Sequence, residues 1–172
     1  MNNSIKIYDN LFSTIDIEYF ISEIKNKELE TVTLKSDNGE YTNFYNRYAI
    51  PDFSKYTTYL ENMLFDEYNQ KYVFQEKGAW INKINTNTNN NDAFHLDSSD
   101  LTIVTYLNDD FIGGEFEYID NNNQHIKIKP QTNVSLIMNN KLLHRVKPIT
   151  IGERLSLVCF FNFDTKTKKT IL

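Results

Sequence analysis

Apolar residues in the first 70 positions recur with a helical period in two segments. In the first segment, Ile17, Phe20, Ile21 and Ile24 follow Ser13 at helical spacing, which predicts a helix with one buried face. The hydroxyl of Ser13 is expected to cap its first turn. We expect the apolar face to pack against a sheet.

A second helix is predicted at about residues 53–68, with Asp52 or Ser54 as its cap. Its apolar side is expected to contain Tyr56, Leu60, Met63, Leu64 and Phe65. Between the two helices, residues 41–50 alternate as a strand does and end at Pro51. Four residues of this strand either line a substrate entrance or pack as ordinary aromatics against a helix: Tyr41, Tyr45, Arg47 and Tyr48.

From Tyr72 onward the pattern changes to short strands separated by turns rich in Asn, Asp and Gly. The predicted strands are residues 72–75, 79–85, 101–108, 115–119, 125–129, 134–138, 142–146 and 155–163. Gly113 and Gly114 are expected to make a tight turn. This succession predicts a mainly β fold of the α+β class, a jelly roll with the N-terminal helices braced against one sheet. The Asn-rich residues 85–92 are expected to form an exposed, mobile loop leading to His95.

Length and composition restrict the class of protein. A chain of 172 residues fits one domain, with helical support over residues 1–70 and a jelly-roll core over residues 72–163. Cys159 is the only cysteine, which excludes an intramolecular disulfide framework and a cysteine-cluster metal site. The net charge of −5 argues against nucleic acid as the main partner. Without a long apolar run or a leader-like N-terminus, we expect a cytoplasmic protein with no membrane partner. The sequence does not specify an oligomeric state.

Two of the three histidines, His95 and His144, lie at the ends of predicted strands beside polar loops. Asp97 is two positions from His95, so both side chains leave the same face of an extended segment and one cation can bind both. With His144 they would bind a metal through two imidazoles and one carboxylate, the ligand set of non-haem iron(II) oxygenases, which leaves positions open for catalysis. The alternative is a solvated loop and ordinary strand ends. Arg145 should face away from His144.

Arg154 stands at the start of an apolar strand, where an unpaired guanidinium is costly to bury. Its planar fork matches a carboxylate. A dicarboxylic acid could therefore bind the metal with a keto-acid end and Arg154 with its far end. Tyr106 either donates its hydroxyl to the same carboxylate or is a core aromatic with its hydroxyl at the rim.

Three runs occur in order along the chain: His95-Leu96-Asp97, YLNDDFIGGE at residues 106–115, and HRVKPITIGER at residues 144–154. Together they resemble the iron(II)- and 2-oxoglutarate-dependent oxygenases of the prolyl 4-hydroxylase type. The sequence is particularly similar to small bacterial and viral members whose last motif reads H-R-V-x-P-V-T-x-G-x-R. The resemblance covers about residues 79–163, and residues 8–13 also resemble the start of the family.

This resemblance implies a double-stranded β-helix, iron(II) bound by His95, Asp97 and His144, and 2-oxoglutarate anchored by Arg154 with Tyr106 assisting. Ser156 lies two residues beyond Arg154, so it is expected on the same face as a further donor. The co-substrate is expected to be surrounded also by Val104, Phe116, Val146 and Phe160. Where many members carry a Tyr upstream of H-x-D, this chain has Asn85 in that wall.

The implied reaction is hydroxylation of an unactivated C–H bond with O2, coupled to decarboxylation of 2-oxoglutarate to succinate and CO2, with ascorbate as a stimulant. Related halogenases lack the carboxylate at the position of Asp97, so its presence favours hydroxylation. The resemblance favours a prolyl residue of a protein or peptide as substrate. The alternatives are hydroxylation of a small molecule such as a free amino acid, and a non-catalytic jelly-roll binding module. A peptide would need an open groove beside residues 85–92, whereas a small substrate would need a closed pocket with its own charge partners.

Overall fold

Two helices and twelve strands form the described part of the chain, which is residues 5–25, 27–35, 41–88 and 93–165 of the computed structural model. The helices are α1 (Thr14–Ile24) and α2 (Ser54–Tyr68). The strands are β1 (Lys6–Asp9), β2 (Glu30–Lys35), β3 (Tyr41–Ala49), β4 (Tyr72–Asn85), β5 (Leu101–Tyr106), β6 (Ile112–Gly113), β7 (Phe116–Ile119), β8 (His125–Ile128), β9 (Val134–Asn139), β10 (His144–Val146), β11 (Ile149–Ile151) and β12 (Glu153–Phe163). No helix among these residues has the length and apolarity needed to cross a membrane.

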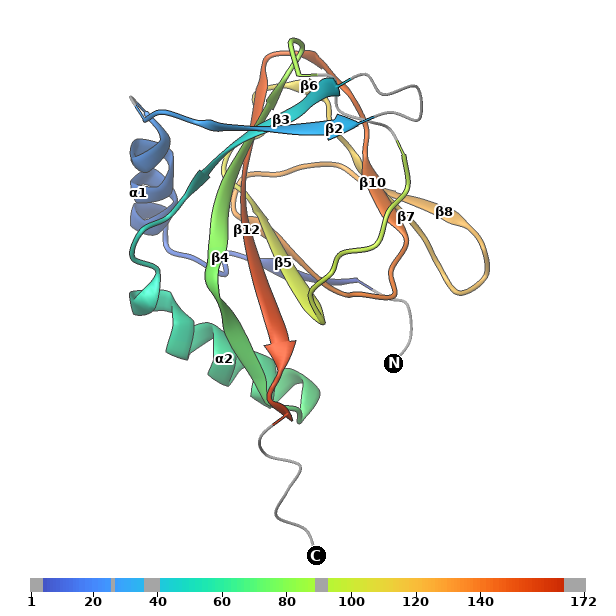
Figure 1. The fold of residues 1–172 in the computed structure, drawn as a ribbon. Helices are drawn as coiled ribbons and strands as arrows, with labels where there is room; N and C mark the ends of the chain where they lie inside the picture. The colour runs from blue at the N-terminus through green and yellow to red at the C-terminus, as the bar shows by residue number, and fades with distance from the viewer. Residues whose placement is uncertain (1–4, 26, 36–40, 89–92, 166–172) are drawn as a thin grey trace, which may run out of the picture.

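Seven antiparallel strands form the main sheet, in the order β1-β9-β5-β12-β4-β3-β2. The remaining strands form a three-stranded sheet, β10-β7-β8, and a two-stranded sheet, β11-β6. Figure 1 shows β10, β7 and β8 on the side of the main sheet opposite α1 and α2. The two sheets therefore face each other, as the predicted jelly roll requires.

The start of α1 is determined by the predicted cap. Ser13 Oγ accepts a hydrogen bond from the Asp16 amide at 3.2 Å, and Asp16 Oδ2 accepts one from the Ser13 amide at 3.3 Å, which is a capping box. Asp16 also accepts hydrogen bonds from Tyr56 Oη at 2.7 Å and Lys55 Nζ at 2.9 Å, both in α2. The same carboxylate thus caps one helix and docks it to the other.

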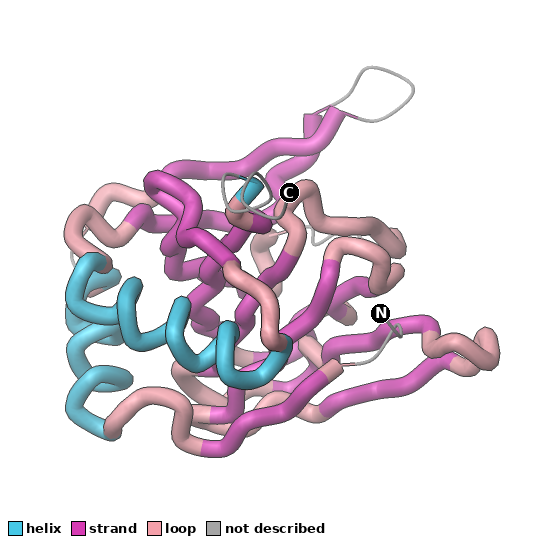
Figure 2. Tube along the Cα trace, turned by 90° about the horizontal axis from the view of Figure 1, so that it is seen from below, coloured by secondary structure: helices cyan, strands magenta, loops and turns pink. Residues whose placement is uncertain are grey.

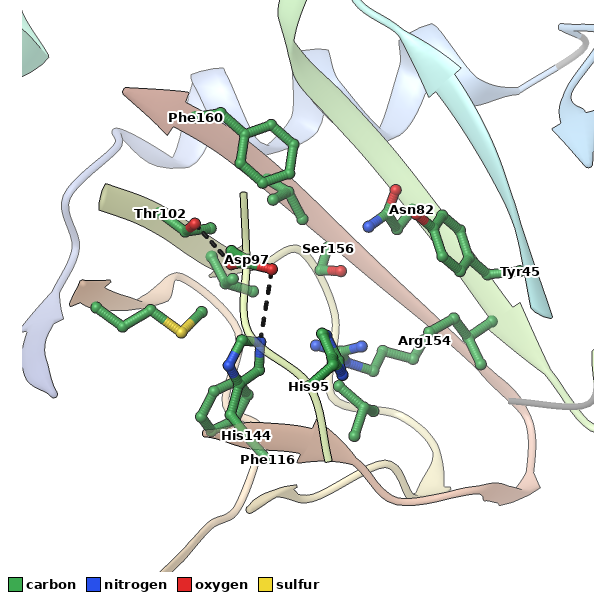
Figure 3. A pocket seen from close by; sticks show the side chains of 15 residues that line it. Tyr45, Asn82, His95, Asp97, Thr102, Phe116, His144, Arg154, Ser156 and Phe160 are labelled. Carbon is green, nitrogen blue, oxygen red and sulfur yellow. Dashed lines mark hydrogen bonds and ion pairs between the residues drawn. The ribbon is translucent and has the colours of Figure 1, made fainter. Parts of the chain in front are cut away.

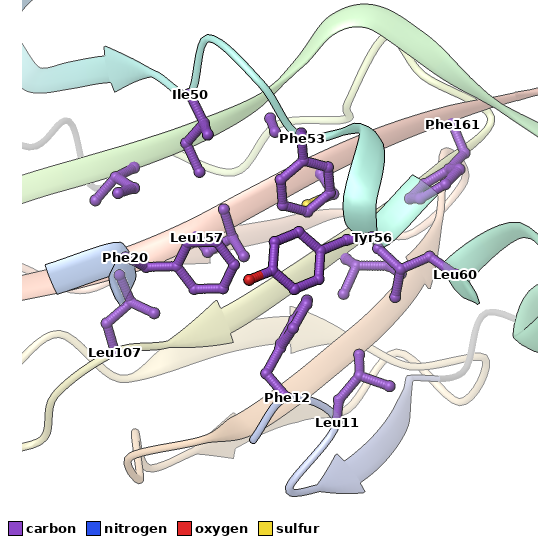
Figure 4. Close-up of a cluster of buried hydrophobic side chains, with 14 of the residues drawn as sticks. Leu11, Phe12, Phe20, Ile50, Phe53, Tyr56, Leu60, Leu107, Leu157 and Phe161 are labelled. Atoms are coloured by element: carbon purple, nitrogen blue, oxygen red, sulfur yellow. The ribbon is translucent and has the colours of Figure 1, made fainter. Parts of the chain in front are cut away.

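The larger core lies between the helices and the main sheet. Figures 2 and 4 show both helices on one face of the sheet, with a cluster of aromatic and aliphatic side chains beneath them. Phe20 and Tyr56 pack with ring centroids 5.2 Å apart, and Leu60 is fully buried beside them. The predicted apolar faces are confirmed, except that Phe65 is 49% exposed and does not belong to this core.

Strand β12 separates this core from the interior of the jelly roll, because its successive side chains alternate between the two faces. Leu155, Leu157, Cys159 and Phe161 belong to the helix-side cluster. Arg154, Ser156, Val158 and Phe160 line the interior. The chemistry-bearing residues of this strand therefore face the opposite sheet.

Several elements differ from those predicted. The two short strands expected at residues 72–75 and 79–85 are one strand, β4, because an irregularity at Lys77, where φ is 57°, lets pairing with β12 resume on both sides. In α2 the N-cap position is Phe53, which makes no capping hydrogen bond through its side chain, but the predicted Asp52 accepts a hydrogen bond from the amide of Ser54, the first residue of the helix, at 3.0 Å. Strands β1, β2, β6 and β11 were not predicted, so the first 70 residues contribute three sheet strands besides the helices.

Candidate active site

His95 and His144 face each other across a short backbone bridge. The His95 amide donates to the His144 carbonyl at 2.8 Å, and the His144 amide donates to the His95 carbonyl at 3.0 Å. Directly opposed residues of an antiparallel pair project from the same side. The two imidazole rings accordingly lie 4.4 Å apart between centroids.

Backbone contacts leave one nitrogen of each ring available. His144 Nδ1 lies 2.9 Å from the Leu142 carbonyl, and His95 Nδ1 lies 3.3 Å from the Ala93 carbonyl. An Nδ1 that donates to a carbonyl leaves Nε2 as the lone-pair atom, which is how ligating histidines are usually oriented. Burial lowers the pKa of His144, with the Asp97 carboxylate opposing this shift, and so favours the neutral form that a metal needs.

Asp97 completes a group of three potential ligands. Its Oδ1 lies 3.8 Å from His144 Nε2, and one donor atom from each of His95, Asp97 and His144 falls within 4.8 Å of the others. Two imidazoles and one carboxylate converging on one point form a facial triad, which suits iron(II) and leaves sites for other ligands. The three metal ligands predicted from sequence are brought together (Figure 3).

A cavity of about 250 Å³ opens beside the triad, between the two sheets. Its walls include Ser156, Val104, Phe116, Val146 and Phe160, all predicted around the co-substrate, together with Arg154 and the triad itself. Phe116 also stacks on His144, with ring centroids 5.1 Å apart and an interplanar angle of 16°. Further lining residues that were not predicted are Asn82, Ile84, Thr102, Met138 and Val158.

Arg154 lines the cavity, and Tyr106 is buried beside it but is not among the residues that line the cavity. Only 3% of Arg154 and none of Tyr106 is exposed, and the guanidinium carbon lies 5.1 Å from the centre of the Tyr106 ring. Burial lowers the pKa of Arg154 and raises that of Tyr106, and each group partly opposes the shift of the other. Arg154 Nε and Tyr106 Oη have no hydrogen-bond partner among the described residues. Buried donors of this kind call for an explanation, and an absent anionic ligand supplies one.

Asn82 and Tyr45 line the cavity, whereas Asn85, which was predicted in its wall, does not. Asn82 is paired with Ser156 across β4 and β12, and its buried Oδ1 likewise has no partner among the described residues. Tyr45 was expected either to line a substrate entrance or to pack as an ordinary aromatic residue, and it does line the cavity. Figure 3 shows Tyr45 and Asn82 on the same side of the cavity as Arg154.

Asn85 lies elsewhere. Its side-chain oxygen accepts a hydrogen bond from the Asn87 amide at 2.9 Å, and its amide donates to Thr88 Oγ1 at 2.9 Å, so it closes a turn and does not line the cavity. The predicted mobile loop at residues 85–92 is described only as far as this turn, and residues 89–92 lie outside the described residues.

Arg145 faces away from the cavity, as its position next to His144 predicts. Its Nε and Nη2 both lie 2.7 Å from Oε2 of the buried Glu117, and its guanidinium carbon is 4.3 Å from the centre of the Phe94 ring. His125, an exposed residue of β8, places its Nδ1 3.0 Å from Glu117 Oε1. This outer cluster holds Phe94, and with it the start of the His95 segment, against the smaller sheet.

The residues that sequence reasoning missed lack a local signal. Asn82 could be found only from its register with Ser156, and that register depends on the continuity of β4. Thr102 donates a 2.6 Å hydrogen bond to Asp97 Oδ2, and this contact depends on how the backbone bends between the two residues. Period-two alternation from Val104 does place Thr102 on the cavity face, but not against Asp97.

Comparisons with known proteins agree with this geometry. A family model described as "2OG-Fe(II) oxygenase superfamily" matches residues 81–163, which include the triad and Arg154. No curated protein sequence matches the chain.

Solved structures share its fold at low identity. A Trichoplax adhaerens prolyl hydroxylase in complex with a hypoxia inducible factor oxygen degradation domain peptide fragment is 15% identical, with a TM-score of 0.72, covering 99% of this chain and 88% of that one. A Pseudomonas putida prolyl-4-hydroxylase is 13% identical, with a TM-score of 0.71 and 94% of each chain covered. HygX from Streptomyces hygroscopicus, with nickel, 2-oxoglutarate and hygromycin B bound, is 16% identical, with a TM-score of 0.66, covering 95% and 84%. These likenesses support the jelly-roll fold.

Proposed function

We propose that the protein, whose residues 81–163 match the model of the 2OG-Fe(II) oxygenase superfamily, hydroxylates an unactivated C–H bond of a prolyl residue in a protein or peptide. The observation that carries the oxygenase chemistry is the convergence of His95, Asp97 and His144 beside a cavity that contains a buried arginine. When bound, iron(II) with 2-oxoglutarate and O2 supplies the oxidising power, and the products are succinate, CO2 and an alcohol.

The far end of 2-oxoglutarate is assigned to Arg154 in this proposal. A carboxylate there would accept hydrogen bonds from Arg154 Nε and Tyr106 Oη, the two buried donors without partners among the described residues. Bonds between ionised groups in a dry site are the strong ones, and the guanidinium fork orients a carboxylate in a plane. Ser156 and Asn82, paired in register beside this end, offer further polar contacts. The donor set therefore fits a dicarboxylic co-substrate.

Apolar side chains form much of the cavity wall. Val104, Phe116, Val146, Val158 and Phe160 present apolar surface around the polar end. Charge interactions strengthen when water is excluded, and a reactive intermediate is shielded from side reactions. In this proposal these side chains orient the co-substrate and limit the access of water to it, while the oxidation itself depends on the iron and its co-substrate.

The size of the cavity supports a peptide substrate. A volume of about 250 Å³ must accommodate 2-oxoglutarate, while pockets for drug-sized ligands alone span roughly 300–1,000 Å³. A free amino acid would also need partners for its ammonium and carboxylate groups, yet the charged groups among the described lining residues are the triad and Arg154. A substrate that stays outside and inserts one uncharged side chain meets both constraints, and a prolyl ring is such a group.

The first test is an anaerobic titration of the iron(II)-loaded protein with 2-oxoglutarate, which follows the visible charge-transfer band of a keto acid chelated to iron(II). We expect the band in the wild type and none in Asp97→Ala. Asp66→Ala, in an exposed position on α2 on the other side of the main sheet, is the matched control and should keep the band. A wild type that binds iron(II) without the band would refute the assignment.

Substrate class is tested by succinate release with proline-containing peptides and with free amino acids, each with and without ascorbate. The proposal expects peptide-stimulated turnover that ascorbate increases. Stimulation by a free amino acid and by none of the peptides would favour small-molecule hydroxylation instead.

A further inference from the structure

Asp97 is held by a hydrogen bond from a neighbouring buried hydroxyl. Thr102 Oγ1 donates to Asp97 Oδ2 at 2.6 Å, while Asp97 Oδ1, the other oxygen, lies on the side of His144 Nε2 at 3.8 Å. The two carboxylate oxygens therefore have different surroundings. One is occupied by Thr102, and the other is directed to the point where the three potential ligands converge (Figure 3).

The proton positions along this contact follow from the chemistry of its members. Ser99 Oγ lies 2.9 Å from Thr102 Oγ1, and both residues are buried, at 1% and 2% exposure. An ionised carboxylate only accepts hydrogen bonds, so the single proton of Thr102 goes to Asp97. Thr102 Oγ1 must then accept the proton of Ser99. Ser99 therefore donates a hydrogen bond to Thr102, and Thr102 donates one to Asp97.

Resting on the proposed function, we infer that Thr102 is a positioning residue that makes Asp97 a one-oxygen ligand of the metal. Asp97 lies in an irregular segment outside any strand, so the backbone alone does not determine which oxygen faces the metal. Thr102 lies in β5 within the main sheet, and its branched side chain has few rotamers. A carboxylate free to rotate could bind through both oxygens and occupy a position that 2-oxoglutarate needs. The hydroxyl of Thr102 withholds Oδ2 from the metal.

The test measures metal affinity without turnover, using Mn(II) and the loss of the EPR signal of the free ion. Thr102→Val keeps the shape of the side chain but removes the hydroxyl. We expect it to weaken Mn(II) binding by roughly 10–100-fold, as changes to the partners of metal ligands typically do. Thr102→Ser should restore affinity to within about threefold of the wild type, because the donor returns. Ser99→Ala should weaken binding by a smaller factor.

A matched control lies in the same strand. Thr105 is fully buried and shares a 2.7 Å hydrogen bond with Ser135, but it is three residues from Thr102 and so on the helix-side face. Thr105→Val removes an equivalent buried hydroxyl and should leave Mn(II) affinity unchanged, whatever it does to the melting temperature. Loss of affinity in Thr102→Val alone separates positioning from a general loss of stability.

A second readout reports the coordination mode. At saturating iron(II), Thr102→Val should give a weaker 2-oxoglutarate charge-transfer band than the wild type, because the second oxygen of Asp97 competes for the position. The inference is overturned if Thr102→Val binds Mn(II) as tightly as the wild type, or if Thr102→Ser loses as much affinity as the valine variant. Should Thr102→Val not fold, unchanged affinity in Ser99→Ala overturns it. Failure of the wild type to bind Mn(II) would instead count against the proposed function.

Discussion

Replacing Arg154 by methionine should separate the stability of the protein from its affinity for the co-substrate. The guanidinium is buried, and no anionic partner for it is present among the described residues. Methionine has a similar length and no charge. Exchange of buried charged groups for apolar ones is neutral or stabilising by about 1–4 kcal/mol. We therefore expect Arg154→Met, without ligands, to melt at the same temperature as the wild type or higher, by about 2–4 °C for each kcal/mol gained.

Co-substrate binding should change in the opposite direction. Removing one partner of a buried, hydrogen-bonded charge pair costs about 2–5 kcal/mol, which corresponds to a Kd for 2-oxoglutarate raised ~30- to ~5,000-fold. The anaerobic charge-transfer titration measures this Kd directly. Thermal shift gives a second measure, because a ligand stabilises by about 2.7 kcal/mol when present at a hundredfold excess over its Kd.

Lys83→Met is the control, since Lys83 lies on the neighbouring strand β4, forms a 2.8 Å ion pair with Glu153 and does not line the cavity. It removes one cation and should leave the Kd for 2-oxoglutarate within about threefold of wild type, in keeping with the weak effect of surface pairs. The reasoning is refuted if Arg154→Met binds 2-oxoglutarate as the wild type does. It also fails if the variant is markedly less stable without ligand.

Two further predictions concern the supports of the fold and the site. Burial opposes ionisation of Asp16, but hydrogen bonds from Ser13, Tyr56 and Lys55 outweigh it and lower its pKa. The stability that Asp16 contributes is present above the unfolded pKa of about 4 and is lost as pH falls below it. Asp16→Ala should therefore lower the free energy of unfolding, measured by urea denaturation, by about 1–2 kcal/mol at neutral pH. A loss of the same size in strong acid would contradict this. Glu117→Gln breaks the buried pair with Arg145, so it should lower the free energy of unfolding by about 3–5 kcal/mol and weaken Mn(II) binding. An unchanged melting temperature and an unchanged Mn(II) affinity would show that this cluster does not support the site.

The candidate metal ligands could be predicted from sequence because they lie in short motifs that occur in a fixed order along the chain. His95 and Asp97 are two residues apart, so any extended backbone places them on one face. Arg154 is conspicuous for a different reason, since a guanidinium within an apolar strand needs a partner. Both arguments hold without knowledge of which strands are neighbours. The described structure brings these residues to one cavity.

Residues whose role depends on register or loop geometry could not be predicted. Asn82 reaches the cavity only because β4 pairs with β12 in the register that sets it opposite Ser156. Asn85, three residues further along the same strand, was predicted in the wall but closes a turn with Thr88 instead. A shift by one residue moves every side chain of a strand to the other face, and alternation alone does not choose between the two faces.

The two faces of the main sheet divide the tasks of stability and function. The helix-side cluster contains most of the buried apolar residues, whereas the cavity side has a smaller cluster beside Arg154, Tyr106 and Asn82, whose buried atoms lack partners among the described residues. Unsatisfied polar groups cost free energy in the ligand-free state, and the large helix-side core can offset that cost. A ligand that satisfies these atoms would recover it as binding free energy. Substitutions on the helix side should consequently change stability with little effect on Kd, while those facing the cavity should change Kd first.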